Sequence, residues 1–125
     1  MKYDDLVGRV MNELELGKRA EGVRAIRATL TPLSERLQEG EATDLAGSLP
    51  MEIDYYVLSA EHGQKFGFNE FIDRAAEIEN CDRSDALWHV KNIFKVLADA
   101  VPQGEIEDIQ GSLPEEYSPL FEQLE

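Results

Sequence analysis

Apolar residues recur every three or four positions along most of this chain, which is the pattern of amphipathic helices. Four such stripes stand out before any other feature: Leu6, Val7, Val10, Met11 and Leu14; Val23, Ile26, Leu30, Leu33 and Leu37; Phe71, Ile72, Ala75 and Ile78; Leu87, Val90, Phe94, Leu97 and Val101. No stretch alternates apolar and polar residues for long, as a half-buried strand would. The pattern therefore predicts an all-α fold.

The stripes belong to a sequence that repeats. Residues 40–52 (GEATDLAGSLPME) and 104–116 (GEIEDIQGSLPEE) agree at eight of thirteen positions, and the same 64-residue shift superimposes the two long apolar stripes upstream. A one-residue slip also aligns YDDLVGRV with FNEFIDRA. Self-similarity at a fixed period indicates a repeated structural unit. We predict one domain, 1–125, of about eight helices: repeat one over 3–58, an exposed linker over 59–67 and repeat two over 68–122, packed with pseudo-two-fold character.

The shared GSLP tetrapeptide predicts how the helices connect. Short helices over 41–46 and 105–110 would end at a glycine in the left-handed conformation. The serine would cap the next helix, the leucine would enter the core and the proline would lie in the first turn. An anion-binding loop is the rival interpretation, but Glu115 and Glu116 follow the second copy and would repel an anion.

Local signals refine the helix ends and the burial of the long helices. Asp4 and Asn69 are expected N-caps, and Asp82 is expected to form a capping box with Asp85. Because the second long helix has the wider apolar face, we expect it to be central and the first to be peripheral. Pro32 predicts a kink in the first; a new helix restarting there is the alternative.

These stripes define the expected core. Its members are Leu6, Val10, Val23, Ile26, Leu30, Leu33, Leu37, Leu45, Leu49, Phe71, Ile72, Leu87, Val90, Phe94, Leu97, Val101, Ile109 and Leu113.

Charge changes the picture of the surface. The chain of 125 residues has 26 acidic and 12 basic side chains and a net charge of −14, and residues 101–125 hold seven acids and no base. Such a surface repels nucleic acid and is used by halophiles to stay soluble. No apolar run is long enough to span a membrane, MKYDDLVGRV lacks the core of a signal peptide, and one cysteine excludes an internal disulfide. We expect a cytoplasmic protein with a halophilic type of surface.

Few residues have the pattern of a reactive site. His62 falls in the linker and His89 on a long helix, with no cysteine or second histidine at metal-ligand spacing in the sequence. Cys81 is interpreted as an incidental thiol, and the cluster Glu105, Glu107 and Asp108 as a solvated face. Phosphate-binding loops, dinucleotide fingerprints and nucleophile elbows are missing. We therefore expect no catalytic residue, cofactor or metal.

Two groups of residues are candidates for an interaction surface. Trp88, with Lys91 and Lys95, falls on the polar side of the second long helix, and Arg24 and Arg27 fall on that side of the first. Tryptophan and arginine dominate binding hot spots. The alternative for Trp88 is that it packs against repeat one or the linker, since large aromatic side chains are usually well buried.

A family resemblance agrees with this description. Two long helices, each followed by G-E-x-x-D-[LI]-x-x-x-L-P-x-E, with Y-x-x-L-F after the second motif, resemble the prokaryotic family catalogued as domain of unknown function 2267, over roughly residues 3–122. The resemblance implies an all-α prokaryotic domain, a kind common in bacteria and haloarchaea, and supplies no catalytic residues. Lys18 and Pro32 depart from the family pattern.

The most economical hypothesis is a non-catalytic protein-interaction module. Its partner would be a basic protein or another copy of the chain, because the neutral, arginine-bearing first third and the acidic C-terminal segment are electrostatically complementary. Two alternatives remain: an enzyme or small-ligand binder with its site between the repeats, and nucleic-acid binding through Arg24 and Arg27.

The charge generates a first prediction. If the acidic surface is adapted to salt, the thermal unfolding midpoint should rise between dilute buffer and molar KCl, because cations screen the repulsion among carboxylates. Scanning calorimetry at both salt concentrations measures this shift. A midpoint that stays level or falls would exclude the adaptation.

Overall fold

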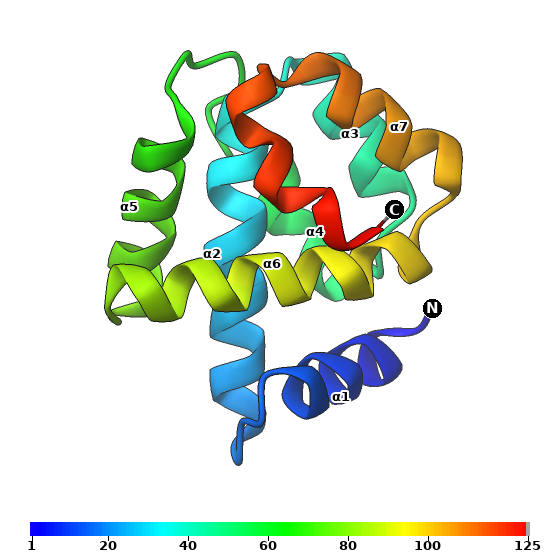
Figure 1. The fold of residues 1–125 in the computed structure, drawn as a ribbon. Coiled ribbons are helices and arrows are strands. Elements are labelled where there is room, and N and C mark those ends of the chain that lie inside the picture. The colour runs from blue at the N-terminus through cyan, green and yellow to red at the C-terminus, as the bar shows by residue number, and fades with distance from the viewer. Residues whose placement is uncertain (125) are drawn as a thin grey trace.

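The computed structural model describes residues 1–124 and shows an all-α protein (Figure 1). Its elements are α1 (Tyr3–Glu13), α2 (Arg19–Arg36), α3 (Glu39–Gly47), α4 (Met51–Leu58), α5 (Phe68–Glu79), α6 (Arg83–Ala100), α7 (Gln103–Ser112) and two 3-10 helices, η1 (Glu115–Leu120) and η2 (Glu122–Leu124). The described residues contain no strand, which confirms the predicted class. No helix within residues 1–124 combines the length and the apolar character that crossing a bilayer requires.

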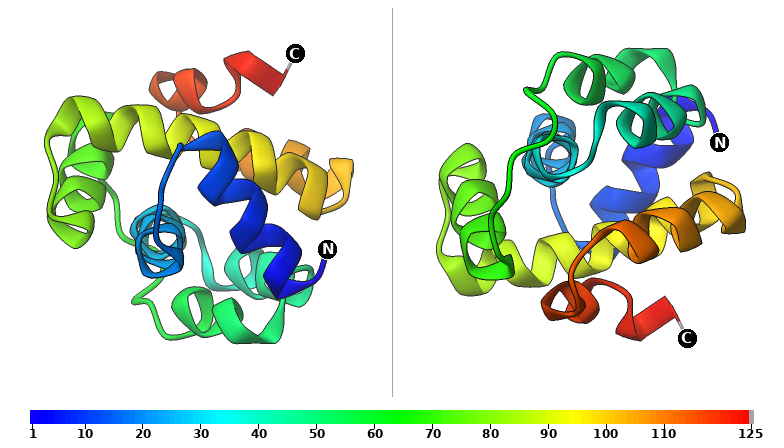
Figure 2. Two further views of the ribbon diagram at one scale, coloured as in Figure 1. Left: turned by 90° about the horizontal axis from the view of Figure 1, so that it is seen from below. Right: turned by 90° about the horizontal axis from the view of Figure 1, so that it is seen from above.

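Helix α2 forms the centre of the molecule. It contacts α1, α4, α5 and α6, and Figure 2 shows it end-on among them. The expectation that α2 is peripheral is therefore wrong, whereas α6 is central as expected, since it contacts α1, α2, α5, η1 and η2. The small residues on one flank of α2 allow neighbouring helices to approach closely. A Cβ added at Gly22 would lie 3.0 Å from Met11 Cγ of α1. The helix continues through Pro32, so the alternative of a restart there is also wrong.

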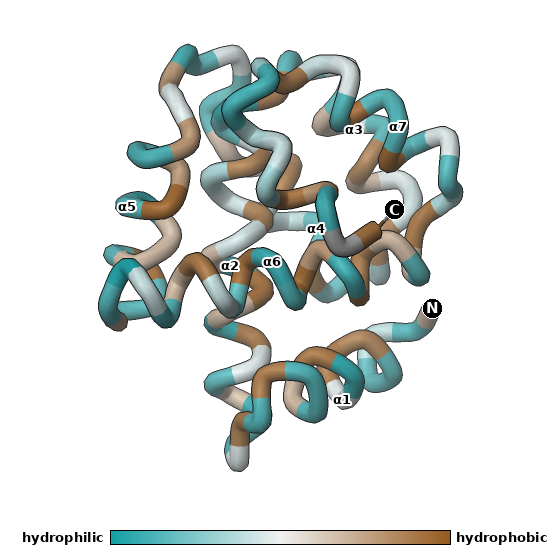
Figure 3. Tube along the Cα trace, in the orientation of Figure 1, coloured by the Kyte–Doolittle hydropathy of each residue, from teal (hydrophilic) through white to brown (hydrophobic). Residues whose placement is uncertain are grey.

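The core follows the predicted stripes with two exceptions. All the expected core residues are buried apart from Val23 and Leu87, which are half-buried against its edge. These two hold equivalent positions near the start of the long helices, where fewer neighbours cover them. Apolar and polar stretches alternate along the helices in Figure 3, as amphipathic packing requires.

The predicted N-caps are displaced. Lys2 and Gly67 occupy the N-cap positions of α1 and α5, so Asp4 and Asn69 lie inside the first turn and not at its cap. Asp82 is the N-cap of α6, but its side chain makes no capping hydrogen bond. An acidic side chain in the first turn remains favourable there through the helix dipole.

The GSLP segments connect the helices in a different way from the one predicted. Gly47 is the last residue of α3 and Gly111 lies inside α7; neither has a positive φ. The ends are closed by tight turns: Ser48 N donates to Leu45 O at 3.0 Å, and Leu113 N to Gln110 O at 3.4 Å. The prolines that follow are extended N-caps of α4 and η1. Burial of the two leucines is confirmed.

The connection between α4 and α5 lies along the C-terminal end of α2. Gly63 N donates to Leu37 O and Gln64 N to Glu35 O, both at 2.8 Å, which satisfies carbonyls that the end of a helix leaves without partners. Gly63 has a φ of 82°, a conformation that glycine adopts without strain. The linker was expected to be exposed, yet Phe66 within it is buried because it belongs to the core.

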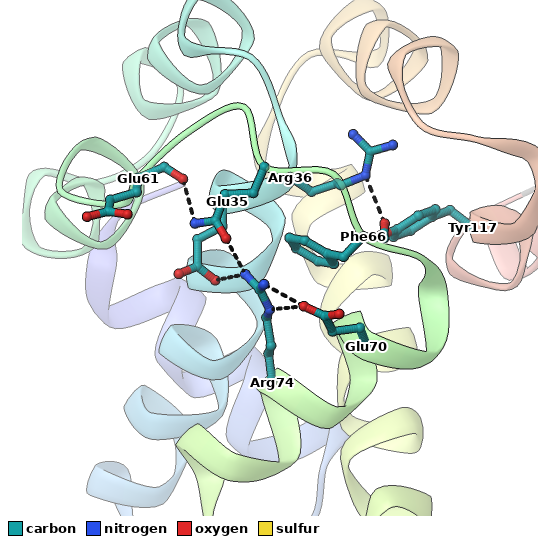
Figure 4. Close-up of polar contacts among 8 residues, drawn as sticks. Glu35, Arg36, Glu61, Phe66, Glu70, Arg74 and Tyr117 are labelled. Atoms are coloured by element: carbon teal, nitrogen blue, oxygen red, sulfur yellow. Dashed lines mark hydrogen bonds and ion pairs between the residues drawn. The ribbon is translucent and has the colours of Figure 1, made fainter.

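Phe66 joins the linker to three helices (Figure 4). Its carbonyl oxygen accepts hydrogen bonds from Tyr117 Oη of η1 at 2.6 Å and from Arg36 Nε of α2 at 3.0 Å. The Arg74 guanidinium of α5 lies 3.8 Å from the centre of the Phe66 ring and also bonds to Glu35 at 3.1 Å. Because the carbonyl group and the ring of Phe66 together contact all three helices, the linker fixes the position of one half of the chain relative to the other.

Removing one of these bonds tests the arrangement. Tyr117→Phe should lower the free energy of unfolding by about 1 kcal/mol, since it deletes a buried hydrogen bond and leaves the ring in place. Urea denaturation measures the change. Tyr55→Phe, at an exposed tyrosine of α4, is the matched control and should be nearly neutral. Equal effects of the two substitutions would contradict a specific role for the Tyr117 hydroxyl.

Candidate functional site

The structure separates the residues proposed around Trp88. The Trp88 side chain is 45% exposed, so the interpretation that it packs against repeat one or the linker is wrong. Lys95 is occupied by an ion pair with Glu13 of α1, with Nζ and Oε2 3.7 Å apart, and Lys91 is half-buried. Trp88 is therefore an exposed aromatic side chain without a free basic cluster beside it.

The second basic candidate is better exposed. Arg24 and Arg27 both lie on the open side of α2, one turn apart. Their exposure agrees with the sequence-based expectation, and their role in binding stays a prediction.

A group of exposed apolar residues lies elsewhere, on α4. Met51, Tyr55 and Leu58 are 81%, 67% and 49% exposed. Their spacing of four and three residues places them on one face of the helix, opposite the buried Ile53 and Val57. We call these three residues the α4 stripe. Sequence analysis missed it because MEIDYYVL is apolar on both faces, and only the tertiary packing decides which face is covered.

Acidic groups border the α4 stripe. Glu52 is exposed and Asp54 half-buried on the same helix. Beside the start of α4, a depression of about 420 Å³ is lined by residues of both α1 and α4, Asp4 and Glu52 among them. The helix that carries the apolar stripe is therefore acidic, and the depression beside it holds the basic Lys2 as well as the two carboxylates.

Two cavities lie between the halves of the chain. One of about 300 Å³ separates α1 from the C-terminal helices and is lined by Arg9, Asp99 and Ile106 among others. Another, of about 360 Å³, is lined by carboxylates of α3 and α7. His89 lines neither cavity, so the convergence of a histidine with carboxylates that an inter-repeat enzyme would need is not found in these two.

The cavity between α3 and α7 concentrates negative charge from both halves. Glu41 and Asp44 of α3 face Glu105 and Asp108 of α7. Burial raises the pKa of Glu105, and the nearby Asp44 and Asp108 raise it further. Packing α3 against α7 therefore brings carboxylates together, and their repulsion at neutral pH lowers the stability of the fold.

The fold also brings together three residues that the sequence keeps apart. Glu79 and Cys81, at the end of α5, meet His89 of α6, with their ligand atoms all within 4.8 Å of one another. Burial raises the pKa of the Cys81 thiol to about 11, with smaller contributions from Glu79, Asp85 and Asp82. A protonated thiol is a poor nucleophile, which agrees with the interpretation that Cys81 is not catalytic. The grouping itself was missed, because it depends on the sharp turn between the helices.

A comparison with models of known protein families matches most of the chain. A family model described as "Uncharacterized conserved protein (DUF2267)" matches residues 3–120, nearly the whole chain. No protein with curated annotation matches the sequence.

The acidic cavity generates a prediction about pH. The raised pKa of Glu105 means that folding disfavours its ionised form. The contribution of Glu105 to the stability of the fold is therefore fully present below the ordinary pKa near 4.5 and is lost as pH rises through the raised pKa. Glu105→Gln should therefore raise the thermal midpoint at pH 7 by roughly 1–3 °C, and the gain should vanish near pH 4.

A matched substitution separates this effect from net charge. Glu77→Gln on the exposed side of α5 makes the same change in charge and should leave the midpoint nearly unchanged at both pH values. If both variants raise the thermal midpoint equally, the repulsion is a property of the whole net charge and is not located between α3 and α7.

Proposed function

The chain belongs to the DUF2267 family of conserved proteins, and we propose that it is a non-catalytic protein-interaction module. The observation that supports this proposal most strongly is the α4 stripe, an apolar face that the fold leaves uncovered although Ile53 and Val57 on the opposite face are packed into the core. Single exposed apolar residues are ordinary on protein surfaces, whereas contiguous apolar faces mark sites of association.

The geometry of the α4 stripe fits recognition between helices. Anchors spaced by four and three residues lie along one line of a helix, and this spacing is used when amphipathic helices dock against a partner. Met51 supplies an adaptable thioether and Tyr55 a rigid ring with a polar tip, both of which are common at binding surfaces. The stripe therefore offers anchors of the kinds that carry binding energy.

Charge selects the partner. The chain carries a net charge of −14, and Glu52 and Asp54 lie on the stripe's own helix. Two copies of such a surface would repel each other, whereas a segment with lysine or arginine beside its apolar anchors would be attracted. We therefore assign the occupant as a basic amphipathic segment of another protein.

Trp88 forms a second, separate candidate surface. Its ring is exposed on α6, and the exposed Arg24 and Arg27 lie on α2. These residues are the sequence-based candidates, and they serve as the comparison for the α4 stripe in the experiment below.

We also propose that the fold arose by tandem duplication. The helix order α1 to α4 recurs as α5, α6, α7 and η1, and the contacts of one half mirror those of the other: α2 packs on α5 and α6 packs on α1, while α2 meets α6 and α3 meets α7. Such reciprocal contacts are those of two units related by a two-fold axis. A best superposition of the halves far from a half turn would contradict this relation.

The binding proposal predicts which variant loses its partner. In pull-downs from cytoplasmic lysate, where we propose the protein acts, a Met51→Ser/Tyr55→Ser double variant should lose a basic partner that Trp88→Ala and Arg24→Gln/Arg27→Gln retain. With the purified partner, loss of one anchor worth about 2 kcal/mol weakens binding about 30-fold, so the double variant should lose at least that. Isothermal titration calorimetry measures the affinity, and circular dichroism checks the fold.

Other outcomes assign the surface differently. If the double variant keeps the partner and Trp88→Ala loses it, the α6 surface is the binding site. If light scattering shows a dimer of the wild-type chain that the double variant converts to monomers, the occupant is a second copy, and the assignment of a basic segment is wrong.

A further inference from the structure

We propose that Glu79, Cys81 and His89 form a binding site for a divalent transition-metal ion of the Zn²⁺ class at the corner between α5 and α6. The three side chains come from the end of one helix, the turn, and the second turn of the next helix. They offer one carboxylate oxygen, one sulfur and one imidazole nitrogen, all within 4.8 Å of one another.

The turn is built to bring these residues together. Asn80 ends α5 in the left-handed conformation, with a φ of 58°, and reverses the chain within a few residues. Cys81 N donates to Ala76 O at 3.1 Å, which fixes the cysteine against the last turn of α5. Helix α6 then starts at Arg83 and carries His89 back beside Glu79. Three ligands on two helices are thus positioned by backbone structure and not by a flexible loop.

The His89 ring lies against the Glu79 carboxylate. Its Nδ1 atom is sealed from solvent and forms an ion pair with Glu79 Oε2 when the ring carries a proton there. The His89 and Glu79 side chains are only 14% and 11% exposed. Because this pair is shielded from water, a cation that displaces the proton would keep both atoms satisfied.

The donor set indicates the class of metal. Thiolate, imidazole and carboxylate together suit Zn²⁺ and its neighbours, whereas Mg²⁺ and Ca²⁺ prefer oxygen ligands alone. Ligands of one tetrahedral Zn²⁺ lie ~3.5 Å apart. The paired His89 and Glu79 atoms would therefore separate slightly as the ion enters, while atoms up to 4.8 Å apart would approach. Three protein ligands leave a fourth position for water.

The electrostatic environment favours a cation. Asp82 and Asp85 add their fields to that of Glu79 at the Cys81 sulfur. Binding would form a metal–sulfur bond and release the thiol proton to solvent, since a coordinating thiol is deprotonated. Burial is the main cause of the raised pKa of the Cys81 thiol, whereas the carboxylates that raise this pKa further would stabilise the dication that replaces the proton.

A built-in reporter makes the site testable. Trp88 is the only tryptophan, and its ring centre lies 5.7 Å from that of His89. The full chain, treated with a chelator and desalted, is titrated with CoCl₂. We expect one equivalent to quench Trp88 fluorescence, to produce the absorption band of a cobalt–thiolate bond and to be displaced by ZnCl₂. ZnCl₂ should also raise the thermal midpoint of the chain, because an ion bound only to the folded state stabilises it.

Variants of the three ligands decide the assignment. Cys81→Ser should remove the thiolate band, and Cys81→Ser, His89→Gln and Glu79→Gln should each weaken binding by about 10- to 100-fold or more. His62→Gln and Glu77→Gln, a histidine in the linker and a glutamate on the same helix, are the matched controls and should bind like the wild type. Circular dichroism of each metal-free variant verifies its fold.

The wild-type titration decides the question even where a variant fails to fold. Absence of the cobalt–thiolate band in the wild-type chain would overturn the proposal. So would binding that folded Cys81→Ser and His89→Gln variants retain in full, which would place the ion on surface carboxylates. Because none of these readouts involves a protein partner, the result is independent of the proposed function of the α4 stripe.

Discussion

The close approach of four helices to α2 is the constraint on which the rest of the structure depends. A helix surrounded in this way leaves little room for large side chains, and Gly22, Ala25 and Ala28 supply the space. The tight fit at Gly22, where an added Cβ would lie 3.0 Å from Met11, shows how little of that space is spare. Close packing of this kind makes the interior stiff and sensitive to added volume. Because α4 packs one face against α2 and α3, its opposite face is left uncovered.

The helices themselves were predictable because their apolar spacing is a local property. The five-residue stripe starting at Val23 and its counterpart starting at Leu87 predicted the two long helices, and eight of the ten stripe residues are buried. The central position of α2 was not predictable from the width of its apolar face. Alanine, glycine and buried Thr29 contribute little to that width, yet they allow neighbours to come close, so the more polar helix became the more buried one. Thr29 avoids the cost of burial by donating its hydroxyl hydrogen to Ala25 O at 3.0 Å.

Residues that form the candidate sites were harder to foresee, each for a physical reason. The α4 stripe has the same composition as the core face beside it, and only the packing of α4 against α2 and α3 distinguishes them. Glu79 and His89 lie on different helices, and they meet because Asn80 ends α5 and the chain reverses there. Phe66 illustrates the same limit: a linker rich in glycine and polar residues predicts exposure, but one aromatic ring within it joins the core. Exposure of Trp88 was predictable as one of two alternatives, because the position of this residue opposite the apolar stripe follows from local spacing alone.

The strong negative charge of the chain acts on both proposed sites. It attracts cationic ligands over long distances but does not make either site specific. A net charge of −14 attracts any cation, whether a metal ion or a basic peptide, and does not discriminate among them. In a salt-rich cytoplasm the Debye length falls to about 3 Å at 1 M, so the general attraction is largely screened. What remains under those conditions are interactions at contact distance: apolar burial against Met51 and Tyr55, and coordination by sulfur and imidazole at the α5–α6 corner. At the two proposed sites, selectivity would therefore come from the apolar side chains and from the sulfur and imidazole ligands, since these are the groups whose interactions salt does not remove.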